Sequence, residues 1–238
     1  DITLEPSSKS RAVKDMIIDK SDFWEKHAAV KPYIVADIDP TPKTESKQSI
    51  AQFNALLDAD LCIQCGACHY ACPALEANSD FLGPAALAAA YRFTADTRDE
   101  AKEERLQITF ESGSGVWDCV KCFECAEACP KEVNPIEKIG KLHNMQFEYG
   151  VAESNVATRH AEGFLRGMKK TGYLDEADIV TYSEGLLGTF KHMGTAMKMM
   201  KSGKIHWHSG IPFINSIPKI KNLDEVQKLI EISQTNKL

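Results

Sequence analysis

Apolar and polar positions along the chain recur mostly at helical spacing. This spacing predicts a short helix at residues 20–31, which ends at Pro32, and a second brief helix at Ser49–Leu57. Scattered prolines between the two predict an extended linker. The pattern contains no convincing pair of strands, so we expect a predominantly α-helical chain.

The residue pattern in the middle of the chain predicts three more helices. Pro84 suits the first turn of a helix that contains AALAAAYRFTA, residues 97–107 form a charged helix, and a third helix begins at Pro135. The stretch 81–93 is the most apolar one, yet it is shorter than a membrane span and carries Arg92. We therefore expect a buried helix there and no transmembrane helix in this chain.

The last third of the chain predicts amphipathic helices. One at 153–171 should bury an apolar face made of Val156, His160 or Phe164, Leu165 and Met168. One at 183–202 carries an apolar face made of Phe190, Met193, Met197 and Met200. We interpret this second face as a packed core stripe, with a docking surface for a partner subunit as the alternative. LDEVQKLIEIS closes the chain as a short helix.

Composition and charge exclude several classes of protein. With 238 residues, 43% of them hydrophobic and 26% charged, the chain can bury a sizeable core. Its formal net charge of −6 argues against a nucleic-acid partner, because that binding depends on Lys and Arg. No Ser-His-Asp pattern or dinucleotide fingerprint is present, so we predict no catalytic residue. His206 and His208 fit a surface pair better than a metal site.

All eight cysteines lie in two runs of identical spacing, CIQCGACHYACP at 62–73 and CVKCFECAEACP at 119–130. Disulfides are disfavoured, because cysteines so close together in turns pair poorly and a chain of this length does not depend on bridges. Three cysteines at this spacing can wrap three corners of a [4Fe-4S] cluster. The fourth, which Pro73 or Pro130 follows, reaches a different cluster.

The spacing therefore predicts two [4Fe-4S] clusters whose ligands cross between the runs. Cluster one is assigned to Cys62, Cys65, Cys68 and Cys129. Cluster two is assigned to Cys72, Cys119, Cys122 and Cys125. Structural zinc is the rival, but zinc modules usually supply two pairs of ligands rather than two triplets. Apolar residues inside the loops should keep water from the clusters; they are Ile63, Val120 and Phe123.

The two runs, the segment GPAALAAAYRFTADTRDEAKEERL between them and VWDC at the second run resemble a known domain. It is the C-terminal domain of the iron-sulfur subunit of succinate dehydrogenase and fumarate reductase. AVKDMIIDKSDFWEKHAAVKPYI resembles the segment that leads into this domain. The resemblance implies an α-helical ferredoxin fold that binds two clusters. It also implies electron transfer between an FAD-containing subunit, where succinate and fumarate interconvert, and a quinone-reactive membrane component.

Three departures from that family change the expectation. The cysteines of its N-terminal [2Fe-2S] domain are absent, so we expect this chain to be a fragment, and a [2Fe-2S] cluster would belong to the missing domain. Cys65 and Cys122 are the middle cysteines of the two triplets. The family usually lacks a cysteine at one of these two positions and builds a three-iron cluster there. Because both cysteines are present in this chain, we expect a second [4Fe-4S] cluster instead. Ala74 and Val120 replace residues of the family's quinone site, so direct quinone reduction is not expected here.

The tail, HMGTAMKMMKSGKIHWHSGIPFINSIPKIKNLDEVQKLIE, is similar to the end of the heterodisulfide reductase C subunit. With the eight cysteines, this similarity implies the unorthodox branch of the succinate and fumarate enzymes. In that branch a cysteine-rich subunit related to heterodisulfide reductase B replaces the usual membrane anchor. The expected organisation is a linker at 1–48, a two-cluster ferredoxin domain at 49–150, and a helical extension for subunit docking at 151–238.

We therefore expect the electron-transfer subunit of a succinate dehydrogenase or fumarate reductase complex, which is not catalytic alone. The complex should be peripheral to the membrane, on the cytoplasmic rather than the periplasmic face. The alternatives are an electron relay of the heterodisulfide reductase type and a free ferredoxin-type carrier.

Overall fold

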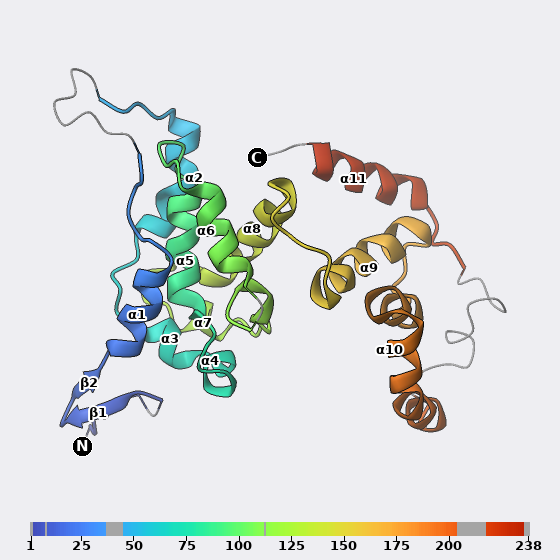
Figure 1. Cartoon of the computed structure of the whole chain (residues 1–238), viewed down its shortest axis with the longest axis horizontal. Helices are drawn as coiled ribbons and strands as arrows, with labels where there is room; N and C mark the ends of the chain where they lie inside the picture. Colours follow the sequence, from blue (N-terminus) through green and yellow to red (C-terminus); the bar gives the residue numbers. More distant parts are fainter. Residues whose placement is uncertain (1, 8, 37–44, 112, 204–217, 236–238) are drawn as a thin grey trace. The chain divides into compact units, whose positions relative to one another are not determined.

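The computed structural model describes the chain except for residues 1, 8, 37–44, 112, 204–217 and 236–238. The described chain is mainly helical, as the sequence predicts. It divides into two compact units, Asp1–Ala152 and Glu153–Leu238, which we call unit 1 and unit 2 (Figure 1).

Unit 1 contains a β-hairpin followed by helices. The strands are β1 (Arg11–Lys14) and β2 (Ile17–Asp19). The first helices are α1 (Ser21–Ala29), α2 (Ile50–Asp60), α3 (Ala67–Ala71), α4 (Pro73–Ala77) and α5 (Gly83–Thr94). They are followed by α6 (Lys102–Phe110), the 3-10 turn η1 (Val116–Asp118), α7 (Glu124–Glu127) and α8 (Pro135–Glu148).

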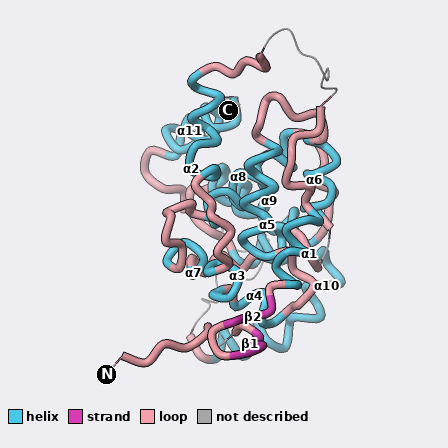
Figure 2. Tube along the Cα trace, turned by 90° about the vertical axis from the view of Figure 1, so that its left-hand side faces the viewer, coloured by secondary structure: helices cyan, strands magenta, loops and turns pink. Residues whose placement is uncertain are grey.

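The hairpin corrects the expectation that the chain has no strand pair. β1 and β2 run antiparallel, with Arg11 opposite Asp19 and Ala12 opposite Ile18. They are the only strands in the described part of the chain (Figure 2). Asp15 in the turn between them has a φ of 50°, a left-handed conformation in which Asp is enriched. Strands this short contain too few residues to show alternation, so the sequence pattern does not reveal them.

The core of unit 1 forms around α5, which packs against α1, α2, α6 and α8 (Figure 1). Most alanines of α5 are buried, and their small side chains let the neighbouring helices approach closely. Cys72 belongs to the same core, so the first cysteine run is anchored to it directly. Larger apolar side chains fill the space between the helices and include Phe81, Leu87, Leu106, Ile139 and Leu142.

Local hydrogen bonds explain where the helices of unit 1 begin. Ser49 caps α2 in a capping box, and Pro84 stands in the first turn of α5, so both helices begin close to the predicted residues. α6 begins at Lys102, later than predicted. The reason is that the Asp99 carboxylate accepts hydrogen bonds from two backbone N–H groups, each at 3.0 Å. Such a side chain competes with the first turn of a helix.

A buried arginine ties the linker to the helical core. Arg105 is 0% exposed and donates to the Asp99 carboxylate at 2.7 Å. It also donates to the backbone carbonyl oxygens of Val30, Lys31 and Tyr33. Because a buried charge is tolerated only when it is paired and hydrogen-bonded, this network fixes the end of α1 and the following residues against α6.

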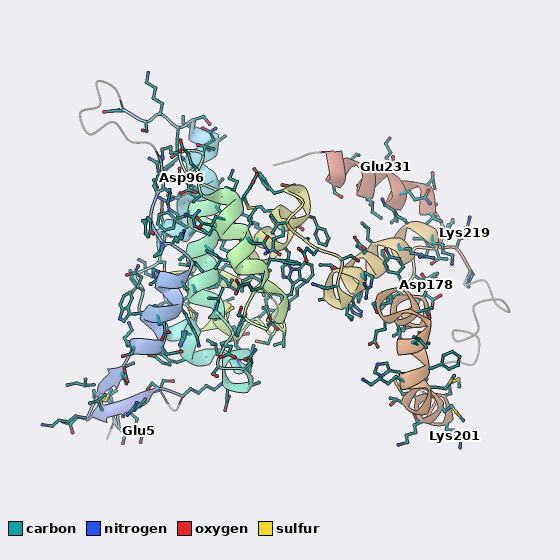
Figure 3. All side chains as sticks on the ribbon, in the orientation of Figure 1. Glu5, Asp96, Asp178, Lys201, Lys219 and Glu231 are labelled. Carbon is teal, nitrogen blue, oxygen red and sulfur yellow. The ribbon has the colours of Figure 1, made fainter. Side chains whose placement is uncertain are left out.

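A second buried network surrounds Asp96, which is labelled in Figure 3. Its carboxylate accepts hydrogen bonds from Arg92, Arg98 and Gln48. Burial alone would raise the pKa of Asp96, but hydrogen bonds from Arg98 and Arg92 outweigh burial and lower the pKa well below its usual range. The folded chain therefore favours the ionised carboxylate.

In its described residues, unit 2 consists of α9 (Val156–Lys170), α10 (Glu176–Lys201) and α11 (Leu223–Thr235). α9 packs against both α10 and α11. Gly163 and Gly167 of α9 are buried, and a Cβ at Gly163 would lie 3.4 Å from Ile179 of α10. The two helices therefore meet at close range through glycine. α10 bends at Gly185 and ends at Lys201 (Figure 3).

The apolar faces predicted to be buried in unit 2 are exposed. On α10, Phe190 is 65% exposed and Met197 is 50% exposed. The prediction of burial is wrong because α9 and α10 pack through small residues and not through these faces. The interpretation as a packed core stripe is therefore wrong as well, while the docking surface stays a prediction. The exposed residues of the α9 face are Val156, His160, Phe164, Leu165 and Met168.

Two further expectations concern the tail and the membrane. His206 and His208 lie outside the described residues. None of the helices that the structure describes combines the length and the apolar character needed to cross a bilayer.

Candidate functional site

The two cysteine runs fold into the same backbone loop. Gln64 and Lys121, at matching positions, have φ angles of 54° and 53°. Gly66 and Phe123, also at matching positions, have φ angles of 87° and 69° and precede the short helices α3 and α7. These left-handed conformations turn the chain tightly, and glycine adopts them without strain. Equal spacing in the sequence thus corresponds to equal local structure.

Four thiols, which we call set one, line a single cavity. Three of them come from the first run and one from the second; they are Cys62, Cys65, Cys68 and Cys129. Phe23 of α1, together with Ala85 and Ala88 of α5, supplies apolar lining. The fold therefore brings together the four residues predicted to hold cluster one, and their binding of a cluster stays a prediction.

The remaining four thiols, which we call set two, act on one another electrostatically. They are Cys72, Cys119, Cys122 and Cys125. Burial, followed by the charges of the other three members, raises the pKa of Cys125 to about 11. Burial also raises the pKa of Cys119, and the charges of Cys72 and Cys122 add to it. Because such interactions weaken with distance, the four thiols are close neighbours.

The two sets lie side by side. Burial, and then thiolates of both sets, raise the pKa of Cys68 to about 12; these thiolates are Cys62, Cys125, Cys129 and Cys65. In addition, α3, which carries Cys68, contacts α7, which carries Cys125. A short path therefore links set one to set two.

Backbone N–H groups point at sulfur in both sets. Burial raises the pKa of Cys62, and a backbone hydrogen bond from Gln64 partly offsets this effect. At the matching position, burial raises the pKa of Cys119, and a backbone hydrogen bond from Lys121 opposes it. The Val133 N–H donates to the Cys129 Sγ at 3.4 Å. Hydrogen bonds to sulfur are among the features that set the potential of an iron-sulfur cluster.

The donor sets fit [4Fe-4S] clusters. All eight cysteines are unpaired, so each set offers the four thiols that one cluster requires. Burial favours the neutral thiol in several of them, so binding of iron has to displace thiol protons. Among the described residues, no group of three or more His, Cys, Asp or Glu side chains is arranged to hold a single metal ion.

The apolar residues inside the loops do not shield the thiols as we expected. Ile63, Val120 and Phe123 are 61%, 65% and 57% exposed. Ile63 is one of the residues that line the cavity of set one, but its exposed side chain covers that cavity only in part. The buried apolar cover of set one is Phe23, which is almost fully buried.

Sequence reasoning missed the contribution of the segment around α1. Lys20 Nζ donates to the carbonyl oxygens of Gln64 and Cys65, at 2.9 and 3.3 Å. His69, which is buried beside Cys68, hydrogen-bonds Asp22 of α1 at 3.0 Å. A signal was available, because IIDKSDFW lies within the segment that resembles the known family.

A comparison with protein families agrees with this geometry. Residues 58–133, which include both cysteine runs, match the family model of the 4Fe-4S dicluster domain. This part of the chain therefore resembles that domain family, and both cysteine runs lie within the match.

Curated relatives of the chain include iron-sulfur subunits of two enzymes. The chain is 36% identical over 149 residues to the fumarate reductase iron-sulfur subunit of Haemophilus influenzae, an alignment that covers 58% of each protein. It is 37% identical over 149 residues to the succinate dehydrogenase iron-sulfur subunit of Paracoccus denitrificans, covering 62% of this chain and 57% of the relative.

A third relative matches more of the chain at lower identity. It is the 8-methylmenaquinol:fumarate reductase iron-sulfur subunit of Wolinella succinogenes, which is 28% identical over 205 residues. That alignment covers 85% of this chain and 63% of the relative. The chain thus spans less than two thirds of each of the three relatives. The expected resemblance to iron-sulfur subunits of succinate dehydrogenase and fumarate reductase is confirmed.

Proposed function

We propose that this chain is the electron-transfer subunit of a succinate:quinone or quinol:fumarate oxidoreductase. It relays electrons through two [4Fe-4S] clusters and has no catalytic residue of its own. One of its partners is an FAD-containing subunit, where succinate and fumarate interconvert. The other is a membrane-associated, cysteine-rich subunit related to heterodisulfide reductase B.

One observation carries this proposal. Two sets of four thiols, each drawing on both cysteine runs, lie side by side within the residues that match the 4Fe-4S dicluster domain. In the proposed arrangement, set one holds cluster one and set two holds cluster two. The names of the relatives support the choice of enzyme.

The residues of the chain bind the clusters and provide the path. When bound, each cluster accepts and releases one electron at a time. Oxidation of succinate to fumarate releases two electrons and two protons. The protons leave at the FAD-containing subunit, so this chain has only electrons to conduct. The backbone N–H groups of Gln64, Lys121 and Val133 stabilise negative charge on the sulfur atoms that they face.

The proposed docking of the cysteine-rich subunit involves unit 2. Its helices α9 and α10 each present an exposed apolar face, which is typical of a surface that another protein covers. The similarity to the Wolinella succinogenes subunit extends over 85% of this chain and therefore includes part of unit 2. Docked in this way, the chain is part of a complex peripheral to the membrane, and we propose its cytoplasmic face.

The cofactors are tested by metal and sulfide analysis of the purified chain. We expect about eight irons and eight acid-labile sulfides per chain. We also expect an EPR spectrum of reduced [4Fe-4S] clusters without a three-iron signal in the oxidised state. Stoichiometric zinc without sulfide would rule the proposal out.

The enzyme is tested by isolating the native complex through a tag on this chain. We expect an FAD-containing subunit that oxidises succinate or reduces fumarate. A flavoprotein without either activity would favour the heterodisulfide reductase-like relay. Recovery of the chain alone, fully loaded with iron, would favour a free ferredoxin-type carrier.

A further inference from the structure

A lysine from outside both cysteine runs contacts the loop of set one. Lys20 precedes α1, and its Nζ donates to the carbonyl oxygens of Gln64 and Cys65 at 2.9 and 3.3 Å. Both carbonyls belong to the loop between the first and third thiols of the set. The ammonium group is therefore bound to the backbone that carries these thiols.

Packing holds the lysine side chain in this place. Its Cε would lie 3.7 Å from a Cβ at Gly66 in the same loop. Its Nζ lies 4.7 Å from the ring centroid of Phe23 and 5.1 Å from that of Trp24, both within cation–π range. Phe23 itself lines the cavity of set one. Contacts on several sides thus fix the position of the charge.

Among the described residues, Lys20 has no ion-pair partner that would neutralise its charge. In the part of the chain that the structure describes, no carboxylate lies within ion-pair distance of its Nζ. Its hydrogen-bond partners are neutral carbonyls, so the full positive charge acts on the surroundings of set one. The side chain is partly exposed, so solvent and salt weaken this action without removing it.

Set two has no equivalent contact. Within the described residues, no side chain donates to the carbonyl oxygens of Lys121 or Cys122, which match Gln64 and Cys65 in the other loop. The two loops share their backbone conformation, yet among the described residues only the loop of set one binds a cation from another segment. The loop of set two instead carries a lysine of its own, Lys121, whose charge opposes the rise in the pKa of Cys119.

We propose that Lys20 raises the reduction potential of cluster one, an inference that rests on the proposed binding of two [4Fe-4S] clusters. Reduction adds one negative charge to the site that set one holds. A fixed positive charge beside that site stabilises the reduced form more than the oxidised form. Because of Lys20, cluster one accepts an electron more readily than it would without the lysine.

The test is a redox titration of the purified chain, followed by EPR, in which Lys20→Met is compared with the wild type. We expect the midpoint potential of cluster one to fall and that of cluster two to stay nearly unchanged. A tenfold weaker binding of the electron corresponds to a fall of about 59 mV. Lys20→Arg keeps the charge and should restore a potential close to that of the wild type.

Lys121→Met is the matched control, because it removes a lysine from the loop of set two and should leave cluster one unmoved. The signal of cluster one is identified as the one that Cys129→Ala abolishes. An unshifted potential in Lys20→Met with full iron and sulfide would overturn the role of Lys20 and leave the proposed function intact. Absence of iron in the wild type would instead overturn the proposed function.

A second neutral variant separates the effect of charge from that of structure. Lys20→Gln lacks the charge but keeps a hydrogen-bond donor. A lowered potential in Lys20→Gln supports the proposal even if Lys20→Met fails to retain iron. If both neutral variants lose cluster one while Lys20→Arg retains it, Lys20 is only a structural tie and the proposal fails.

Discussion

The two units of this chain bury their residues in different ways. Unit 1 is organised around α5, and even its charged groups, such as Arg105 and Asp96, are buried and paired. In unit 2, α9 and α10 meet through Gly163, while large apolar residues such as Phe190 and Met197 stay exposed. Unit 1 pairs its buried charged side chains within itself, whereas unit 2 leaves an apolar surface exposed.

This difference indicates that the two units have different roles. The cysteines all lie in unit 1, where Cys72 and Cys125 are buried and Lys20 hydrogen-bonds the loop of set one. A site that binds a cofactor needs such a rigid surrounding. The exposed faces of unit 2 contribute little to its own stability and are suited to contact with another protein. Substitutions in the two units should therefore have separable consequences.

The largest expected effect comes from the thiol that set one takes from the second run. Cys129→Ala should remove the cluster built on Cys62, Cys65 and Cys68, because three thiolates do not complete its ligands. Iron analysis should fall from about eight to about four per chain. Cys72→Ala is the matched control and should remove the other cluster. If Cys129→Ala selectively removed the cluster around Cys122, the crossed assignment would be wrong.

The next effect concerns the buried arginine of unit 1. Arg105→Met leaves Asp99 buried without its partner and should lower the free energy of unfolding by about 3–5 kcal/mol. Chemical denaturation followed by circular dichroism measures this change. Arg166→Met in unit 2 is the control, because its contact with Asp178 at 3.3 Å is partly exposed and contributes about 0–1 kcal/mol. Equal losses in both variants would contradict the contrast between the units.

A smaller effect is expected from acid. The pKa of Asp96 is lowered in the folded chain, so its ionised form contributes stability at pH values above its ordinary pKa of 3.8. That contribution is lost as the pH falls below 3.8 towards the lowered value. Asp96→Asn should lower the melting temperature at neutral pH. It should also make the melting temperature decrease less steeply as the pH falls. A parallel acid profile in the variant and the wild type would show that Asp96 has no such role.

The smallest effect on stability is expected at the exposed face of α10. The double variant Phe190→Ser and Met197→Ser should change the free energy of unfolding of the isolated chain by less than about 0.5 kcal/mol. Iron content should stay the same, while co-purification of partner subunits should decrease. A loss of stability of several kcal/mol would show that this face packs within the chain itself.

The sequence predicts much of unit 1 because its signals are local. Ser49 and Pro84 mark the starts of α2 and α5, since capping depends on neighbouring residues. The cavity lined by Cys62, Cys65, Cys68 and Cys129 agrees with the partition that the spacing predicts, and the binding of clusters by the two sets stays a prediction. The later start of α6 is not predictable in this way, because it depends on a contact between Asp99 and the distant linker.

The remaining differences arise from packing between distant segments. Periodicity shows that a helix has an apolar face, but it does not show what covers that face, so the exposure of Phe190 could not be foreseen. The contacts of Lys20 and Phe23 with set one depend on how α1 packs against α5. Neither residue has a spacing relationship to the cysteines, so the only sequence signal for them is the family resemblance of the segment that contains them.

The interleaving of the two thiol sets has a consequence for biosynthesis. When the chain has been synthesised as far as Cys72, the first cysteine run is complete. At that stage set one still lacks Cys129, and set two lacks three of its four members. Neither set is complete until the second run has emerged and folded back onto the first. If the two sets hold clusters as proposed, neither cluster can be completed before most of unit 1 has been synthesised, and both sites become complete at almost the same stage of translation.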